Sequence, residues 1–179
     1  MPRISPVTAP EPDSPIAALL AQIKARSGKV IKAYATMAQS PVALEGYLAF
    51  SAALQKGRLT ARQREILALL ISQSNECQYC LSVHSTTARM AGLTPGQIRQ
   101  ARTASSDDPL ENAIATFALK AMQQRGQVSD ADMAAAREAG VDDGLMIEII
   151  ANIALMTMTN YANRLADPVI DFPVVQVQL

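Results

Sequence analysis

The run of residues 65–71 constrains the fold of this chain more than any other feature. It reads EILALLI and is apolar around the whole circumference of a helix. A helix of that kind is central in a hydrophobic core or lies at an interface between subunits. We therefore expect other helices, or a second subunit, to cover this segment on all sides.

Composition favours helices for the rest of the chain. Hydrophobic residues make up 49% of the 179 residues, much of this fraction is alanine, aromatic residues make up only 4%, and tryptophan is absent. Alanine is the best helix former, whereas strands prefer aromatic and β-branched residues. A chain of this length supports one ordinary core. We predict a single all-α domain.

Proline-rich ends flank this domain. Residues 1–13 are predicted to form an extended arm, residues 14–167 the all-α domain, and residues 168–179 an extended C-terminal tail. The arm is either a disordered tail or a strap on a neighbouring subunit. It lacks the apolar segment of a signal peptide, and Ser72 and Asn152 interrupt the longest apolar runs, so we expect a cytoplasmic protein without a membrane span.

Charge argues against two classes of partner. Sixteen basic residues balance sixteen acidic ones, which leaves a formal net charge of zero. A protein that binds nucleic acid or an anionic membrane surface carries a basic patch. We expect neither of these as a partner.

Cap signals divide the body into helices. A serine or threonine followed by proline opens helices at residues 15, 41 and 95, and Thr60 with Gln63 forms a capping box. The last long helix begins near Asp142. Glycines that end helices are expected at Gly28, Gly57, Gly92 and Gly126.

The reactive residue types lie close together in residues 65–84. Cys77 and Cys80 are the only cysteines and His84 is the only histidine. On one helix they stand at i, i+3 and i+7, so that they share a face. With Asn75 as N-cap, Cys77 falls in the first turn and Cys80 just beyond it, where backbone N–H groups stabilise a thiolate. Two cysteines without an export signal indicate a redox or metal site.

Glu65 joins this group only if the chain folds back. In one straight helix, twelve residues would separate it from Cys77 by ~18 Å. A turn near residues 74–75 makes a helical hairpin in which Glu65 and His84 come level. A carboxylate then orients the imidazole, which takes the proton of Cys80. The predicted relay runs from Glu65 through His84 to Cys80, and Cys77 is placed to attack an oxidised Cys80.

The spacing of this motif is echoed later in the chain. Glu148 precedes Asn160 and Asn163 by twelve and fifteen residues, the same intervals that separate Glu65 from the two cysteines. Residues 88–98 and 136–146 also share an Ala-Arg-x-Ala-Gly pattern. We predict an internal duplication whose second copy is a structural twin, with both asparagines in structural roles.

The spacing Glu-x11-Cys-x-x-Cys-x-x-x-His resembles the alkylhydroperoxidase D-like branch of the carboxymuconolactone decarboxylase superfamily. The flanking Ala-Arg-x-Ala-Gly-Leu-Thr and Asn-Tyr-x-Asn segments are similar as well. This resemblance covers roughly residues 28–173. It implies an all-α fold of helical hairpins that assembles into trimers, hexamers or other homo-oligomers.

The same resemblance implies thiol-dependent peroxidase chemistry in antioxidant defence without a cofactor. Cys80 would be the peroxidatic thiolate that attacks a hydroperoxide, Cys77 the resolving cysteine, and Glu65 with His84 the proton relay. The expected reductant is a dithiol, carried by a lipoyl-bearing protein in the best-known members. Tyr79 departs from the family pattern, in which a histidine commonly stands directly before the second cysteine. The decarboxylases lack the cysteine pair, which disfavours decarboxylation.

Two other interpretations are open at this stage. The four residues of the motif could bind zinc, although structural zinc sites rarely take ligands at i, i+3 and i+7 of one helix. The protein could instead be a non-enzymatic redox sensor or scaffold, a helical oligomer with a reversible disulfide. Tyr79 is expected to pack or to face solvent.

Overall fold

The computed structural model describes residues 1–179, apart from the side chains of residues 26 and 27. Its described part is all-helical, without strands. The helices in chain order are α1 (Pro15–Ser27), α2 (Lys32–Met37), α3 (Pro41–Leu54), α4 (Ala61–Ser74), α5 (Gln78–Met90), α6 (Pro95–Arg102), α7 (Pro109–Gln123), α8 (Asp130–Glu138) and α9 (Asp143–Ala166). The predicted all-α fold class is confirmed.

Helix starts follow the cap signals in the sequence. The Ser14 and Ser40 hydroxyls accept from the backbone N–H groups of Ala17 and Ala43, each just before a first-turn proline. The predicted capping box of Thr60 and Gln63 is present. Each such cap stabilises its helix by about 1 kcal/mol.

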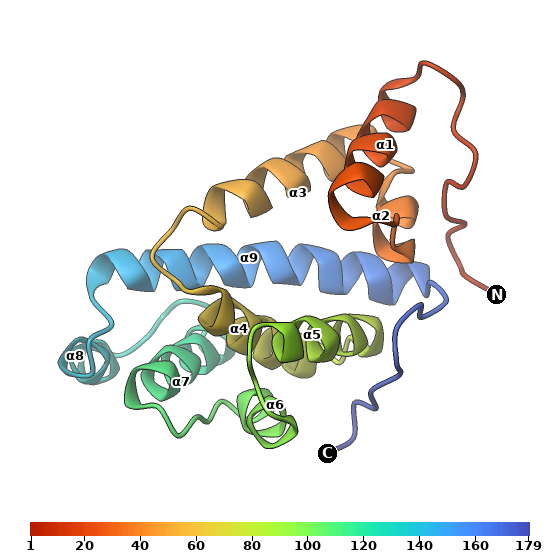
Figure 1. The fold of residues 1–179 in the computed structure, drawn as a ribbon. Helices are drawn as coiled ribbons and strands as arrows, with labels where there is room; N and C mark the ends of the chain where they lie inside the picture. Colours follow the sequence, from red (N-terminus) through yellow and green to blue (C-terminus); the bar gives the residue numbers. More distant parts are fainter.

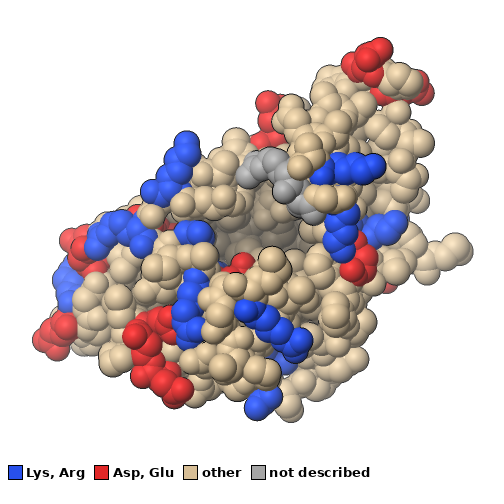
Figure 2. Space-filling view, in the orientation of Figure 1, with Lys and Arg blue, Asp and Glu red and all other residues tan. Residues whose placement is uncertain are grey.

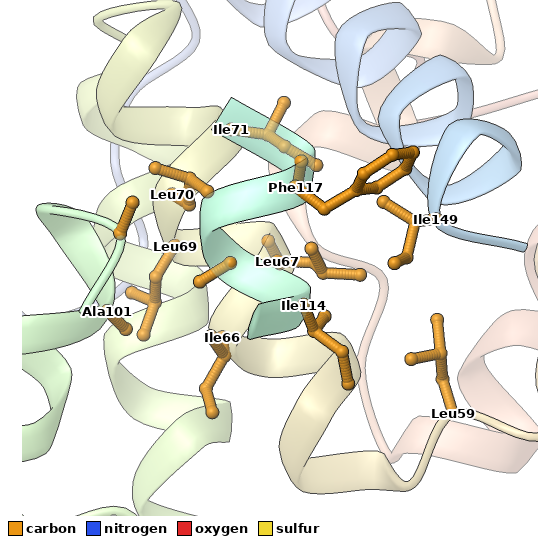
Figure 3. Packing of buried hydrophobic residues seen from close by; sticks show 14 of the residues in the cluster. Leu59, Ile66, Leu67, Leu69, Leu70, Ile71, Ala101, Ile114, Phe117 and Ile149 are labelled. Atoms are coloured by element: carbon orange, nitrogen blue, oxygen red, sulfur yellow. The ribbon is translucent and has the colours of Figure 1, made fainter. Parts of the chain in front are cut away.

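Helix α4 is central, as its apolar circumference predicts. It packs against α5, α6, α7 and α9, and every residue from Ile66 to Ser72 is buried. Figure 3 shows Leu67 beside Ile114 and Phe117 of α7 and Ile149 of α9. Burial of each large apolar side chain contributes about 1.5–3 kcal/mol, so this cluster anchors the helices that carry the reactive residues.

Helix α9 separates the molecule into two parts in Figure 1, with α1–α3 on one side and α4–α8 on the other. It is long and apolar enough to cross a membrane by length and composition, which differs from the sequence-based expectation that Asn152 interrupts such a span. The helix packs against α3, α4, α5 and α7. It is therefore a core helix of this fold.

The surface carries charges of both signs. On the face shown in Figure 2, lysine and arginine side chains alternate with aspartate and glutamate, and the face is hollowed between the α1–α3 part and the rest of the molecule. No large patch of one sign stands out on this face.

Both ends of the chain lie against the helical body. The N-terminal arm donates from Arg3 N and Ile4 N to the Ala166 carbonyl and from Val7 N to the Ala35 carbonyl. The arm therefore contacts α2 and the end of α9 of its own chain. Residues 168–179 contain no helix or strand, and Val175 N donates to the Ser82 hydroxyl of α5 at 3.0 Å.

Asn160 joins α9 to the end of α4. Its side chain is fully buried, accepts from Asn75 Nδ2 at 3.0 Å and donates to the Ser72 hydroxyl at 3.3 Å. An alanine there leaves two polar partners without their hydrogen bonds. We expect Asn160→Ala to lower the free energy of unfolding by about 2 kcal/mol in urea denaturation. Asn112→Ala, at an exposed position, is the control and should change it by less than about 0.5 kcal/mol.

Candidate active site

A tight turn folds α4 and α5 into the predicted hairpin. Asn75 caps the C-terminus of α4, Glu76 takes the left-handed backbone conformation at φ 52°, and Cys77 N donates back to the Ser72 carbonyl at 2.9 Å. This αL ending satisfies the last carbonyls of α4 and reverses the chain. The prediction that Asn75 is the N-cap of α5 is therefore wrong.

Cys77 itself is the N-cap of α5. Its sulfur accepts from the backbone N–H of Cys80 at 3.3 Å. The positive end of the helix dipole and the Cys80 N–H group thus face Cys77 and stabilise negative charge on its sulfur.

The hairpin brings Glu65 and His84 together. Glu65 Oε2 lies 2.9 Å from His84 Nδ1, and it also accepts from the Thr87 hydroxyl at 2.7 Å. With Nδ1–H donating to the carboxylate, His84 Nε2 is the nitrogen left for proton transfer. The predicted pairing of these two residues is present in the structure.

The electrostatic surroundings keep Glu65 ionised. Burial raises the pKa of this carboxyl, but the interaction with His84, the hydrogen bonds from His84 and Thr87, and the charge of Arg64 lower it more. The net result is a pKa below its ordinary value. A charged Glu65 stabilises the protonated imidazole that forms when His84 accepts a proton.

Cys77 and Cys80 form a disulfide with a Cα–Cα distance of 5.3 Å. They are 1% and 3% exposed and pack with Ala33, Tyr79 and their partly buried neighbours. The four predicted residues thus lie on the two arms of one hairpin, with the redox pair held in a largely dry environment.

Asn163 is a site residue that sequence reasoning did not identify. Its side-chain Nδ2 donates to Cys80 Sγ at 3.4 Å, and the residue is 6% exposed. The sequence echo singled it out, but as part of a structural twin. In the structure Glu148 and both asparagines lie on the single helix α9, so no second hairpin exists. A buried amide on α9 needs a partner, and the sulfur of Cys80 supplies it.

Comparison with known proteins identifies a family to which part of the chain is similar. Residues 41–124 match the model of the carboxymuconolactone decarboxylase family. The predicted alkylhydroperoxidase D-like resemblance is confirmed.

Solved structures extend the family resemblance over nearly the whole chain. The alkylhydroperoxidase AhpD core protein from Ralstonia eutropha JMP134, a peroxidase-related protein, is 27% identical, with 96% of this chain and 92% of that chain covered and a TM-score of 0.80. A peroxidase-related protein from Silicibacter sp. TM1040 shares the fold at 21% identity, 93% and 91% coverage and a TM-score of 0.80.

The debrominase Bmp8 has the same fold at 18% identity, with 94% of this chain and 91% of that chain covered and a TM-score of 0.74. None of the curated proteins compared with the chain matches it. Proteins described as peroxidase-related and as a debrominase thus share this fold, so the fold alone does not indicate an activity.

Tyr79 departs from the alkylhydroperoxidase D-like pattern, and the structure shows what it does. Its hydroxyl donates to Asp171 Oδ1 at 2.7 Å and accepts from Ala33 N at 3.1 Å. Burial and the bond to Asp171 raise its pKa, so the phenol stays protonated. Tyr79 is buried, and it joins α5 to α2 and the C-terminal tail.

Tyr47 of α3 is a second residue that the sequence did not reveal. It is buried, and its ring centroid lies 5.9 Å from that of Tyr34. Burial, Tyr34 and the charge of Glu65 raise its pKa. Helix α3 therefore adds a neutral phenol near the Glu65 carboxylate.

The zinc alternative does not match the arrangement of these ligands. The two sulfur atoms are bonded to each other. In the part of the chain that the structure describes, no group of three or more histidine, cysteine, aspartate or glutamate residues is arranged to hold a metal ion.

The contact of Asn163 with sulfur leads to a measurable effect on thiol reactivity. In reduced protein the Asn163 amide donates to the Cys80 thiolate, a charge-assisted hydrogen bond worth about 1.5 kcal/mol or more. In a Cys77→Ser background, Asn163→Ala should slow alkylation of Cys80 by iodoacetamide at pH 7 about tenfold. Asn152→Ala is the matched control, because Asn152 is also buried on α9 but donates to the Glu148 carbonyl. Equal rates in both variants would refute this role.

Proposed function

We propose that the protein is a thiol-dependent peroxidase of the alkyl hydroperoxide reductase type that acts in antioxidant defence. The observation that carries the proposal is the 2.9 Å pair of Glu65 and His84 on the same hairpin as a cysteine pair able to form a disulfide. His84 lies one helical turn beyond Cys80, on the same face of α5.

The reaction balances with the residues present and one external dithiol. In the reduced enzyme His84 takes the proton of Cys80, and the thiolate attacks the peroxide oxygen. The O–O bond breaks, Cys80 becomes a sulfenic acid, and the alcohol leaves with a proton from His84. The Cys77 thiolate then attacks the Cys80 sulfur, the S–O bond breaks and the disulfide forms; the proton that the Cys77 thiol gave up joins the departing hydroxide, which leaves as water. A dithiol supplies the two electrons that regenerate both thiols.

Two further features support this assignment. The N-terminus of α5 stabilises a Cys77 thiolate, and the Asn163 amide stabilises a Cys80 thiolate. Similar proteins described as peroxidase-related share the fold. Because a debrominase also shares the fold, the proposal depends on the side chains rather than on the fold.

The burial of both sulfurs favours one alternative of a different class. A non-enzymatic redox sensor or scaffold would use the same reversible disulfide without turnover. It predicts that peroxide is consumed once per chain at most, whatever reductant is added.

The remaining proposals concern partners and location. The proposed substrate is a hydroperoxide. The proposed reductant is a dithiol, such as the one on a lipoyl-bearing protein. The chain is proposed to assemble into a homo-oligomer such as a trimer or hexamer. Exposed apolar residues on α9, including Ile147, Tyr161 and Leu165, suit an interface between copies. A cytoplasmic location fits because the cycle needs reduced thiols.

The test follows peroxide consumption with dihydrolipoamide, thioredoxin and a monothiol supplied in turn. Consumption of many equivalents of peroxide per chain with at least one of these reductants supports the peroxidase. Consumption of a single equivalent, with a disulfide that forms and can be reduced, supports the sensor instead.

A further inference from the structure

A cavity of about 250 Å³ lies beneath the C-terminal tail, beside the disulfide. Its lining includes Cys77, Tyr79 and Asn163 from the body and Pro168 and Ile170 from the tail. Of the two cysteines, Cys77 lines it and Cys80 does not. The cavity therefore leads to one sulfur of the pair.

The wall that the tail provides is held in place by several contacts. Asp171 accepts from the Tyr79 hydroxyl at 2.7 Å and from Lys32 N at 3.2 Å, and the Phe172 ring packs edge-on against Tyr79 at 6.4 Å. Further along, Arg102 donates to the carbonyls of residues 176 and 177. The cavity is thus a built feature, and its width is set by side chains on both sides.

We propose that this cavity admits the reductant, that the reductant is a slender thiol, and that it attacks the sulfur of Cys77. The proposal rests on the proposed function, whose cycle needs an external thiol. The volume lies below the ~300–1000 Å³ of typical ligand pockets. An unbranched thiol fits it, whereas a folded protein surface does not reach a sulfur that is 1% exposed.

The attack balances as an ordinary thiol–disulfide exchange. The incoming thiolate forms a bond to Cys77 Sγ, the Cys77–Cys80 bond breaks, and its electron pair leaves on Cys80 as a thiolate. The Asn163 amide donates to that sulfur at 3.4 Å and stabilises the new negative charge. A second thiol then attacks the mixed disulfide at the sulfur of the reductant, which releases Cys77 as a thiolate and the reductant as its own disulfide.

Access, rather than the leaving group, selects Cys77. Each sulfur has a hydrogen-bond donor, the Cys80 N–H for Cys77 and the Asn163 amide for Cys80. Stabilisation of the departing thiolate therefore does not favour attack on Cys77 over attack on Cys80. The rate of exchange also depends on which sulfur is reached, and the cavity reaches Cys77.

The charges around the cavity select among slender thiols. Glu76, Arg164 and Asp167 line it, so two carboxylates and one guanidinium leave one net negative charge. Arg164 is paired with Glu76 at 3.3 Å and also donates to the Asn75 carbonyl. A neutral or cationic thiol is favoured over an anionic one.

The test compares the two single-cysteine proteins in their reaction with cystamine, a small cationic disulfide. Mixed-disulfide formation is followed by mass spectrometry at low ionic strength. Cys80→Ser, which keeps Cys77, should react at least about tenfold faster than Cys77→Ser. It should also react about threefold faster with cystamine than with the anionic 3,3′-dithiodipropionate. Equal rates for the two variants, or a faster Cys77→Ser, would overturn the proposal.

A substitution that fills the cavity provides a second test of the access route. In the Cys80→Ser background, Ile170→Trp should slow mixed-disulfide formation about tenfold, because the indole occupies the space that the thiol needs. Ile150→Trp, at a partly exposed position on α9 that lines a different groove, is the matched control and should leave the rate unchanged. Thermal unfolding of both proteins verifies that they fold. An unchanged rate in folded Ile170→Trp would contradict the access route.

These measurements use no peroxide, so the two proposals can fail separately. Fast reaction of Cys77 through the cavity, in a protein that does not turn over peroxide, refutes the peroxidase and keeps the route. Peroxide turnover in a protein whose Cys80 reacts first with cystamine refutes the route and keeps the peroxidase.

Discussion

Replacing Cys80 by serine abolishes peroxide consumption, with kcat/KM reduced by about 10³-fold or more. The hydroxyl of serine is too weak a nucleophile, at neutral pH, to open an O–O bond. Cys77, the one cysteine that remains, stands two helical turns from His84 rather than one and lacks that base. The measurement is the steady-state rate of hydroperoxide loss with excess dihydrolipoamide.

Cys77→Ser is the informative partner of this variant. It keeps the sulfur that we propose is peroxidatic, with its Asn163 donor, but lacks the thiol that we propose resolves the sulfenic acid. We expect a burst of one equivalent of peroxide per chain and then little turnover. If both variants consume peroxide at the wild-type rate, the cysteines have no part in the reaction and the proposed function is wrong.

Substitutions in the Glu65–His84 pair should have the second largest effect. Loss of a positioned acid–base group typically costs 10²- to 10⁴-fold in rate, so His84→Ala should lower kcat/KM about 10³-fold. Glu65→Gln keeps the shape but removes the charge that stabilises the protonated imidazole, and should cost about 10²-fold. Arg62→Gln, on the same helix but paired with Glu111, is a control and should keep the rate within about threefold. Wild-type rates in both pair variants would exclude the relay.

Acid sensitivity provides an independent readout of the same pair. The pKa of Glu65 is lower in the folded protein than its ordinary value of 4.5. Its stabilising contribution is therefore fully present above pH 4.5 and is lost as the pH falls through the depressed folded value. Wild-type protein should lose more stability than Glu65→Gln between pH 6 and pH 3, as measured by urea denaturation at each pH. Parallel losses would show that the carboxylate contributes no such linkage.

Local patterns in the sequence were enough to predict the helices and the hairpin. Ser14, Ser40 and Thr60 are caps with short-range partners, and residues 65–71 have no polar face to expose. The turn after Ser74 followed from the need to bring Glu65 level with His84. All of these depend on residues close in the chain or on a single spacing.

The contacts that the sequence did not predict join distant segments. Asn163 meets Cys80 across 83 residues and Tyr79 meets Asp171 across 92, and neither pair has a spacing that a pattern reveals. The echo at Glu148 was misleading because equal spacing does not require equal folding. The assignment of the N-cap failed for a local reason: Asn75 was needed to end α4, so Cys77 became the cap of α5.

The most direct test of the account is the fate of Cys80 in reduced Cys77→Ser protein given one equivalent of cumene hydroperoxide. Trapping with dimedone and peptide mass spectrometry should find one sulfenic acid per chain, located on Cys80, formed within seconds and in yield equal to the alcohol released. A Cys80 that remains a free thiol while the peroxide persists would contradict the peroxidase mechanism.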